Sequence, residues 1–80
     1  MDKVYTINGG MFDEFRIIFA NADVARQTLR AYANFLKFRQ FEVRFTSDDS
    51  FTFDGRDNVW VSEFSTAHEV PSILANFVTD

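Results

Sequence analysis

The sequence predicts a single small α+β domain spanning residues 1–80. Three observations predict this fold class: apolar residues alternate with period two over several short segments, recur every three or four residues over one long segment, and Asn, Asp, Ser and Gly separate the segments. One proline and three glycines leave no linker that would divide the chain. The expected order is ββαβββα, a mainly antiparallel sheet with one long helix packed on a face and a short C-terminal helix.

The first two strands are expected to form a hairpin. Lys3–Ile7 is a short strand candidate, and Asn8–Gly10 follows with residues that tolerate positive φ. Phe12–Ala20 then places apolar side chains at every second position, at Phe15, Ile17 and Phe19. The two segments should therefore pair as antiparallel strands.

The next segment has the period of a helix. Ala25, Leu29, Tyr32 and Leu36 recur at spacings of three and four, which puts them on one helical face. Either Asn21 or Asp23 can cap the start. Further apolar residues should widen this face, namely Val24, Ala31, Phe35 and Phe38. Three basic residues lie within about 40° of one another on the other side and predict a solvent-facing basic stripe, Arg26, Arg30 and Lys37.

A three-stranded meander is expected after the helix. The period returns to two at Phe41–Thr46, and Ser47–Ser50 has the composition of a turn. Phe51–Phe53 restarts the alternation, Asp54–Asn58 is a second turn, and Val59–Phe64 completes a third strand.

The last segment predicts a short helix. Thr66–Glu69 matches a capping box, and the alternative start is at Pro71 as the first helical residue. Its apolar face would be formed by Val70, Ile73, Leu74, Phe77 and Val78.

Phenylalanine dominates the expected core. Eleven of the 80 residues are Phe, beside Trp60, Tyr5 and Tyr32, and each large aromatic side chain can bury roughly 150–250 Å². A chain of this size buries only about 60% of the surface that its unfolded form exposes. Some Phe side chains are therefore candidates for a binding patch rather than for the core.

Catalytic and metal-binding signatures are missing from the sequence. Without cysteine there is no disulfide, no thiol nucleophile and no thiolate ligand, and His68 is the only histidine. We therefore expect no enzyme activity, no catalytic residue, no cofactor and no metal; a small enzyme would need a pocket that joins His68 to at least two carboxylates. No signal peptide and no apolar run near the ~20 residues of a membrane span are seen, so a cytoplasmic protein without membrane contact is expected.

Carboxylates gather in the two turns of the meander, at Asp48, Asp49, Asp54 and Asp57. Their spacing does not match a calcium-binding loop, and a strand about five residues long would separate the turns by roughly 15–17 Å, too far for one cation. Turn propensity alone explains such residues. The alternative is an acidic edge that binds a protein.

Charge is polarised along the chain. Residues 23–44 carry a local charge of +3, residues 45–80 carry −6, and the whole chain carries −4. If this asymmetry persists in space, the acidic meander would attract a basic partner, while the helix stripe would attract an acidic one. If the opposite charges pair within the fold instead, they contribute little to binding.

These observations favour a non-catalytic protein-binding module. The leading hypothesis is a small acidic inhibitor that blocks a basic surface of a nucleic-acid-processing protein. In size, charge and lack of catalytic motifs the chain is similar to phage-encoded inhibitors of bacterial defence, such as anti-CRISPR proteins, and to immunity proteins that neutralise nuclease toxins. The predicted contact residues are Asp48, Asp49, Asp54, Asp57, Trp60 and Glu63, and the second possible surface is Arg26, Arg30 and Lys37.

The alternative is a structural or assembly protein that acts through homo-oligomerisation or by docking into a larger complex. An open sheet edge or a surplus of exposed Phe would serve this role, and the chain would be a monomer or a homodimer. Direct nucleic-acid binding is disfavoured, because three cations on one helix in a chain of net charge −4 fall short of the basic surface that phosphates require.

Overall fold

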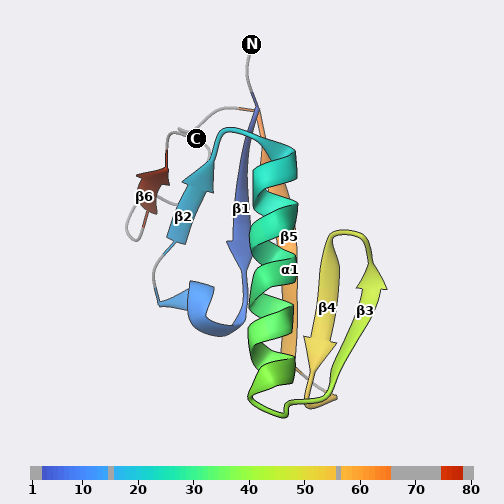
Figure 1. The fold of residues 1–80 in the computed structure, drawn as a ribbon. Coiled ribbons are helices and arrows are strands. Elements are labelled where there is room, and N and C mark those ends of the chain that lie inside the picture. The colour runs from blue at the N-terminus through green and yellow to red at the C-terminus, as the bar shows by residue number, and fades with distance from the viewer. Residues whose placement is uncertain (1–2, 15, 56, 66–74, 79–80) are drawn as a thin grey trace.

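A computed structural model describes residues 3–14, 16–55, 57–65 and 75–78. The chain forms an α+β domain in which one sheet carries a long helix, α1 (Ala22–Phe38), on one face (Figure 1). The strands are β1 (Val4–Asn8), β2 (Arg16–Phe19), β3 (Val43–Ser47), β4 (Ser50–Phe53), β5 (Asp57–Phe64) and β6 (Ala75–Val78). A short 3₁₀ helix, η1 (Gly10–Asp13), lies between β1 and β2. The predicted fold class is thus confirmed at the level of a small α+β domain.

The strand order is β3-β4-β5-β1-β2-β6. Every neighbouring pair is antiparallel except β2 and β6, which run parallel. The longest register joins β1 to β5, from Val4 opposite Phe64 to Asn8 opposite Trp60. This pairing places the N-terminal hairpin beside the meander in one continuous sheet.

The predicted N-terminal hairpin is confirmed, but its second strand is shorter than expected. β1 and β2 pair antiparallel, with Thr6 opposite Ile18. Where a strand was predicted from Phe12, the chain instead makes the one-turn helix η1. Gly9 has φ 96° and leaves no room for a Cβ beside the Asn58 carbonyl, so the chain turns sharply here and directs Phe12 into the core.

Local signals set both ends of α1. Asn21, one of the two predicted caps, accepts hydrogen bonds from the backbone N–H groups of Asp23 and Val24 at 2.7 and 3.2 Å. At the other end Gln40 takes φ 70°, its N–H donates to the Lys37 carbonyl, and the next N–H donates to the Leu36 carbonyl. This pair of bonds is the Schellman arrangement, which normally places glycine at the position of Gln40.

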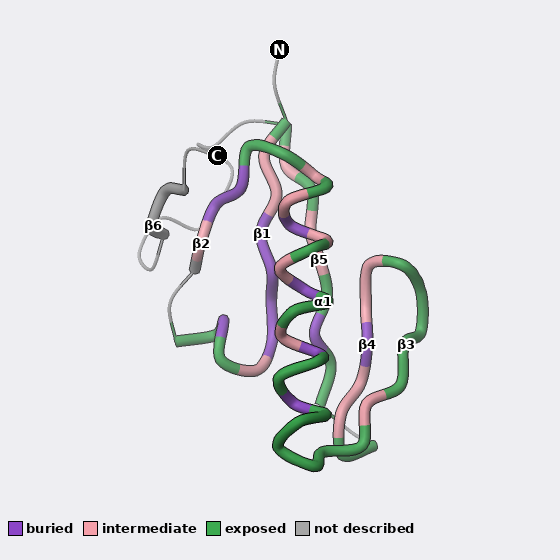
Figure 2. Tube along the Cα trace, in the orientation of Figure 1, coloured by how far each residue is buried: buried purple, intermediate pink, exposed green. Residues whose placement is uncertain are grey.

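The apolar face of α1 is narrower than the sequence predicts. Its buried residues are Ala25, Leu29, Ala33 and Leu36, which face the sheet (Figure 2). Ala31, Phe35 and Phe38, which were expected to widen the buried arc, are exposed. A single helix buries only the side chains that reach the sheet below it, so these three remain at the surface.

The meander is confirmed, and it contains a β-bulge that the sequence did not reveal. Ser47 pairs with Ser50 across the two-residue turn, yet Phe45 pairs with Phe51 and Val43 with Phe53. A regular hairpin would have set Phe45 opposite Thr52, on the other face of the sheet. Thr46 is the extra residue, and it lets the aromatic side chains of β3 and β4 share the face beneath α1.

The core lies between α1 and the sheet. Ile7, Leu29, Phe51 and Val59 are fully buried there, with Tyr32 at the side of the cluster. The ring of Tyr32 is within 5.4 to 6.4 Å of Phe12, Phe51 and Phe53, counted between ring centroids. Aromatic contacts of this kind compensate for the small size of the domain.

The predicted C-terminal helix is not confirmed, and with it the ββαβββα order. Residues Ala75–Val78 form β6, which pairs with β2 in register from Arg16 opposite Ala75 to Phe19 opposite Val78. β2 would otherwise be an edge strand with unpaired backbone groups, and Phe77 and Val78 are residues that favour strands. The predicted start at Thr66–Glu69 or Pro71 lies outside the described residues.

The left-handed conformation of Gln40 gives a test of the helix terminus. Gln40→Gly should stabilise the protein by about 0.5–1 kcal/mol, because glycine adopts positive φ without the strain of a side chain. Gln40→Val should destabilise it, because β-branched residues tolerate this conformation least. Urea unfolding measures both. Equal stability of the two variants would contradict the Schellman terminus.

Candidate protein-binding surfaces

The two acidic turns lie at opposite ends of β4 (Figure 1). Asp48 and Asp49 form the turn between β3 and β4, whereas Asp54 lies in the next turn and Asp57 opens β5. The four-residue strand between them spans roughly 13 Å. The predicted acidic residues are therefore divided between two places.

Asp49 is engaged within the fold. Its Oδ1 accepts a hydrogen bond from Nε of Arg26 at 2.6 Å, and Asp23 lies 3.4 Å from the same guanidinium. The hydrogen bond from Arg26 to Asp49, with the charge of that carboxylate, raises the pKa of Arg26 above its usual range. The backbone carbonyl of Asp49 also accepts a hydrogen bond from the Val61 N–H at 2.9 Å. Asp49 thus ties the turn to α1 and to β5.

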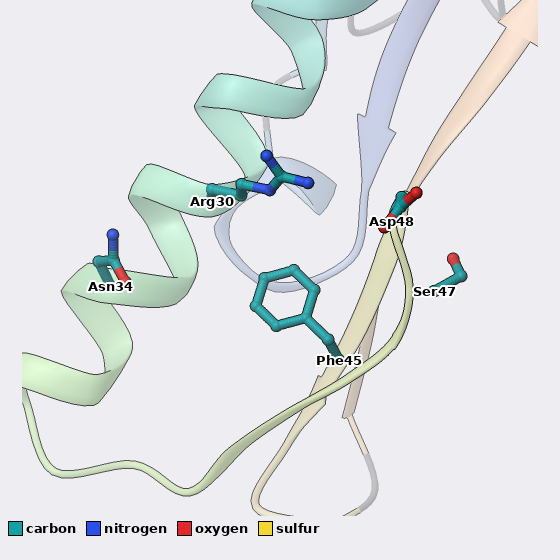
Figure 3. Close-up of a pocket in the computed structure, with 5 residues that line it drawn as sticks. All are labelled: Arg30, Asn34, Phe45, Ser47 and Asp48. Atoms are coloured by element: carbon teal, nitrogen blue, oxygen red, sulfur yellow. The ribbon is translucent and has the colours of Figure 1, made fainter.

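The predicted basic stripe lies on the flank of α1 next to the meander. Arg26 contacts Asp49, and Arg30 lines a cleft with Asp48 on the other wall. The cleft encloses about 270 Å³ and is lined by Arg30, Asn34, Phe45, Ser47 and Asp48. Phe45 lies between the helix and the turn (Figure 3). Of the two charge hypotheses, pairing within the fold holds for Arg26 and Asp49, whereas Arg30 and Asp48 line one cleft without an ion pair between them.

Trp60 lies away from the predicted acidic residues. It alternates with Val59 and Val61, which contact the core beneath α1, so its ring projects from the opposite face of the sheet. Its cross-strand neighbours are Asn8 and Ser50, and 43% of the residue is exposed. The ring is accessible, but on a polar face.

Glu63 forms an ion pair with Lys3, at 2.8 Å between Oε2 and Nζ. This hydrogen bond and the charge of Glu63 raise the pKa of Lys3 above its usual range. Both side chains are about half exposed, so the pair is screened by solvent. It joins the N-terminal residues to the end of β5.

Three acidic residues lie at the same end of the meander, and they include one that the sequence reasoning missed. The Asp54 N–H donates to the Glu42 carbonyl at 3.0 Å, and Asp57 lies opposite Phe53 at the start of β5. We call Glu42, Asp54 and Asp57 the acidic end. All three are exposed, and none forms an ion pair with another described residue. Arg56 lies outside the described residues.

A second surface is apolar. A groove of about 390 Å³ lies between α1 and η1, lined by Met11, Phe12, Thr28, Ala31, Tyr32 and Phe35. Phe35 is 49% exposed, Met11 44% and Phe38, one turn further along α1, 83%. The spacing of Ala31, Phe35 and Phe38 was visible in the sequence, but it indicated core rather than surface.

Among the residues that the structure describes, no group of three His, Cys, Asp or Glu side chains could hold a metal ion. His68 lies outside that part of the chain. No helix within the described ranges is long and apolar enough to span a membrane.

Comparison with protein-family models, with curated proteins and with solved structures found no match to this chain.

The contact between Arg26 and Asp49 predicts a spectroscopic signature. The Nε–H of Arg26 should give a slowly exchanging signal in a ¹H–¹⁵N spectrum at neutral pH, because this proton is held by the carboxylate. Asp49→Ala should remove the signal, whereas Asp48→Ala should leave it in place. Loss of the signal in both variants would contradict a specific role for Asp49.

Proposed function

We propose that this chain is a non-catalytic protein-binding module that inhibits a nucleic-acid-processing protein by covering a basic surface on it. The observation that carries the proposal is the acidic end, because its three residues lie at the same end of the meander, are exposed and are free of ion pairs with the other described residues. Carboxylates without an internal partner can form charge-assisted hydrogen bonds with Lys and Arg of another protein.

The position of the acidic end supports this role. Asp54 and Gly55 both have positive φ, at 56° and 76°, which fixes a tight turn between β4 and β5. Glu42 is joined to that turn through the backbone hydrogen bond to Asp54. A turn whose backbone is already fixed loses little backbone entropy on binding, so more of the interaction energy is available for affinity.

Phe41 supplies an apolar side chain beside these charges. It is 37% exposed and packs edge-on against Phe53, with ring centroids 5.8 Å apart. An aromatic side chain anchored on one side and open on the other is the type of residue that contributes most to protein interfaces. In this proposal Phe41 takes the role of anchor that the sequence assigned to Trp60.

The remaining predicted contact residues receive other roles. Asp49 and Glu63 are paired with Arg26 and Lys3, so they stabilise the fold rather than the complex. Asp48 faces the cleft beside Arg30. Action in the cytoplasm, where such a partner would be met, is part of the same proposal.

Charge reversal tests the acidic end. Immobilised protein would be used to capture partners from a host lysate, and the captured nuclease or helicase would then be titrated in its own activity assay. Inhibition should reach its end point at a simple stoichiometric ratio. The triple variant Glu42→Lys, Asp54→Lys, Asp57→Lys should bind at least about tenfold more weakly, because like charges then face each other.

The matched control changes the net charge by the same amount elsewhere, through Glu14→Lys, Asp23→Lys and Asp48→Lys. These residues are exposed and lie outside the acidic end. The control should retain most of the affinity. Equal losses in both triple variants would show that only net charge matters, and unchanged capture by the first variant would refute the proposed site.

A further inference from the structure

β3 is the outermost strand on the meander side of the sheet. Within the described part of the chain it pairs with β4 alone (Figure 1). Four of its five residues are exposed, and Val43 is half-buried. The unpaired backbone groups of such an edge can accept another strand, and charged side chains are a usual means of preventing this. The side chains of β3 therefore decide which strand the edge can accept.

The free backbone groups at the start of this edge belong to Val43. The Asp54 N–H donates to the Glu42 carbonyl at 3.0 Å, so the backbone of Glu42 bonds toward β4. In an antiparallel ladder every second residue bonds to the same neighbouring strand, so Arg44 also bonds toward β4. Val43, between these two, points its N–H and C=O away from β4.

Glu42 and Arg44 carry opposite charges on either side of Val43. Both line one hollow on the face of the sheet opposite α1, whereas Val43 contacts the core beneath the helix. Neither forms an ion pair with another described residue. On the β4 side Glu42 adjoins Asp54, and Arg44 lies opposite Thr52. The neighbouring strand therefore offers no opposite charge to either residue.

A second copy of the chain offers an opposite charge to both residues in one register. Two identical edges that pair antiparallel are related by a twofold axis. An axis at Val43 sets Glu42 of each copy opposite Arg44 of the other. An axis at Glu42 or at Arg44 sets that residue opposite itself, and an axis at Phe45 brings Glu42 toward Asp48. An axis between two residues sets an outward backbone group against one that already bonds to β4.

We infer that two copies of this chain pair antiparallel through β3, with the twofold axis at Val43, and so join their sheets. The N–H and C=O of Val43 bond to the same groups of the second copy. Glu42 and Arg44 form non-hydrogen-bonded pairs, in which the Cα atoms are about 4.5 Å apart and the side chains are closest. On the α1 face, the exposed Phe45 lies opposite the exposed Phe41 of the second copy.

The short paired segment makes this dimer a weak one. Residues 41–45 extend over roughly 17 Å, so the dimer should dissociate readily, with a Kd of roughly 10–100 μM. Glu42 and Phe41 also belong to the surface proposed for a basic partner. Pairing with a second copy and binding of that partner would therefore exclude each other, although the dimer itself does not depend on the proposed function.

Complementary charge reversals test the pairing. Sedimentation velocity of the protein alone, from about 5 to 500 μM, should show a monomer–dimer equilibrium. Glu42→Arg and Arg44→Glu should each weaken association about tenfold or more, because each sets like charges opposite one another. An equimolar mixture of the two variants should associate again, since every cross-strand pair is then of opposite charge. The double variant with both changes should dimerise like the unchanged protein, for the same reason.

A control and a direct measurement locate the contact. Glu14→Arg changes the net charge as Glu42→Arg does, at an exposed position next to η1, and should leave the dimer intact. In a mixture of ¹³C-labelled and unlabelled protein, an intermolecular NOE should join the Hα of Glu42 to the Hα of Arg44, because this pair is the closest across the axis. Circular dichroism would show that each variant stays folded, as expected at exposed positions.

Three results would overturn the inference. A monomer at every concentration would show that the edge does not accept a second copy. A dimer that survives both single reversals would place the contact elsewhere on the molecule. A mixture of the two variants that stays monomeric would refute the register. No partner protein is present in these measurements, so each result leaves the proposed inhibition to its own test.

Discussion

The pairing of β1 with β5 is the interaction on which the rest of the structure depends. It joins residues that are more than fifty positions apart and places the N-terminal hairpin beside the meander, so that one sheet is wide enough to carry α1. Ile7 and Val59, one from each strand, are fully buried under the helix. Gly9 is required at the end of this pairing, where the backbone passes against the Asn58 carbonyl and a side chain would collide with it. The fold is therefore stabilised by a non-local contact between two short strands, closed over by aromatic side chains.

Most helices and strands were predicted from interactions between residues close in sequence. The features that were missed depend on contacts between segments that are distant in sequence. The cap at Asn21, the period of α1 and the turn residues of the meander each act within a few residues, and the sequence revealed all three. The bulge at Thr46 could not be predicted in this way. The two-residue turn by itself would have set the aromatic residues of β3 and β4 on opposite faces, and only the demand of the shared core favours the extra residue. The strand Ala75–Val78 is similar, because its partner is the edge of β2, near the other end of the chain.

The same bulge explains why the candidate site was predicted only in part. Asp54 and Asp57 were expected from turn composition, but Glu42 reaches Asp54 because the bulge shifts the register of β3 by one residue. Without it, a regular hairpin would have set Glu42 opposite Gly55. Asp49 and Glu63 were equally visible in the sequence as charged residues, yet both are paired, and the pairing depends on α1 and the N-terminal residues, which are distant in sequence. Charge composition thus identifies candidates, while register decides which of them are available.

The exposed charges and the exposed apolar residues of α1 lie on different flanks of the helix. Arg26 pairs with the acidic turn on the meander side, and Arg30 lines the cleft on that same flank. The exposed Phe35 lies on the flank next to η1, because the sheet covers only the face that carries Leu29, Ala33 and Leu36. At the turn between β4 and β5, by contrast, exposed carboxylates form no ion pair with another described residue. A chain with a net charge of −4 can thus carry cations on one flank of its helix and carboxylates at one end of its sheet, because the sign of each surface is set by local register and not by composition.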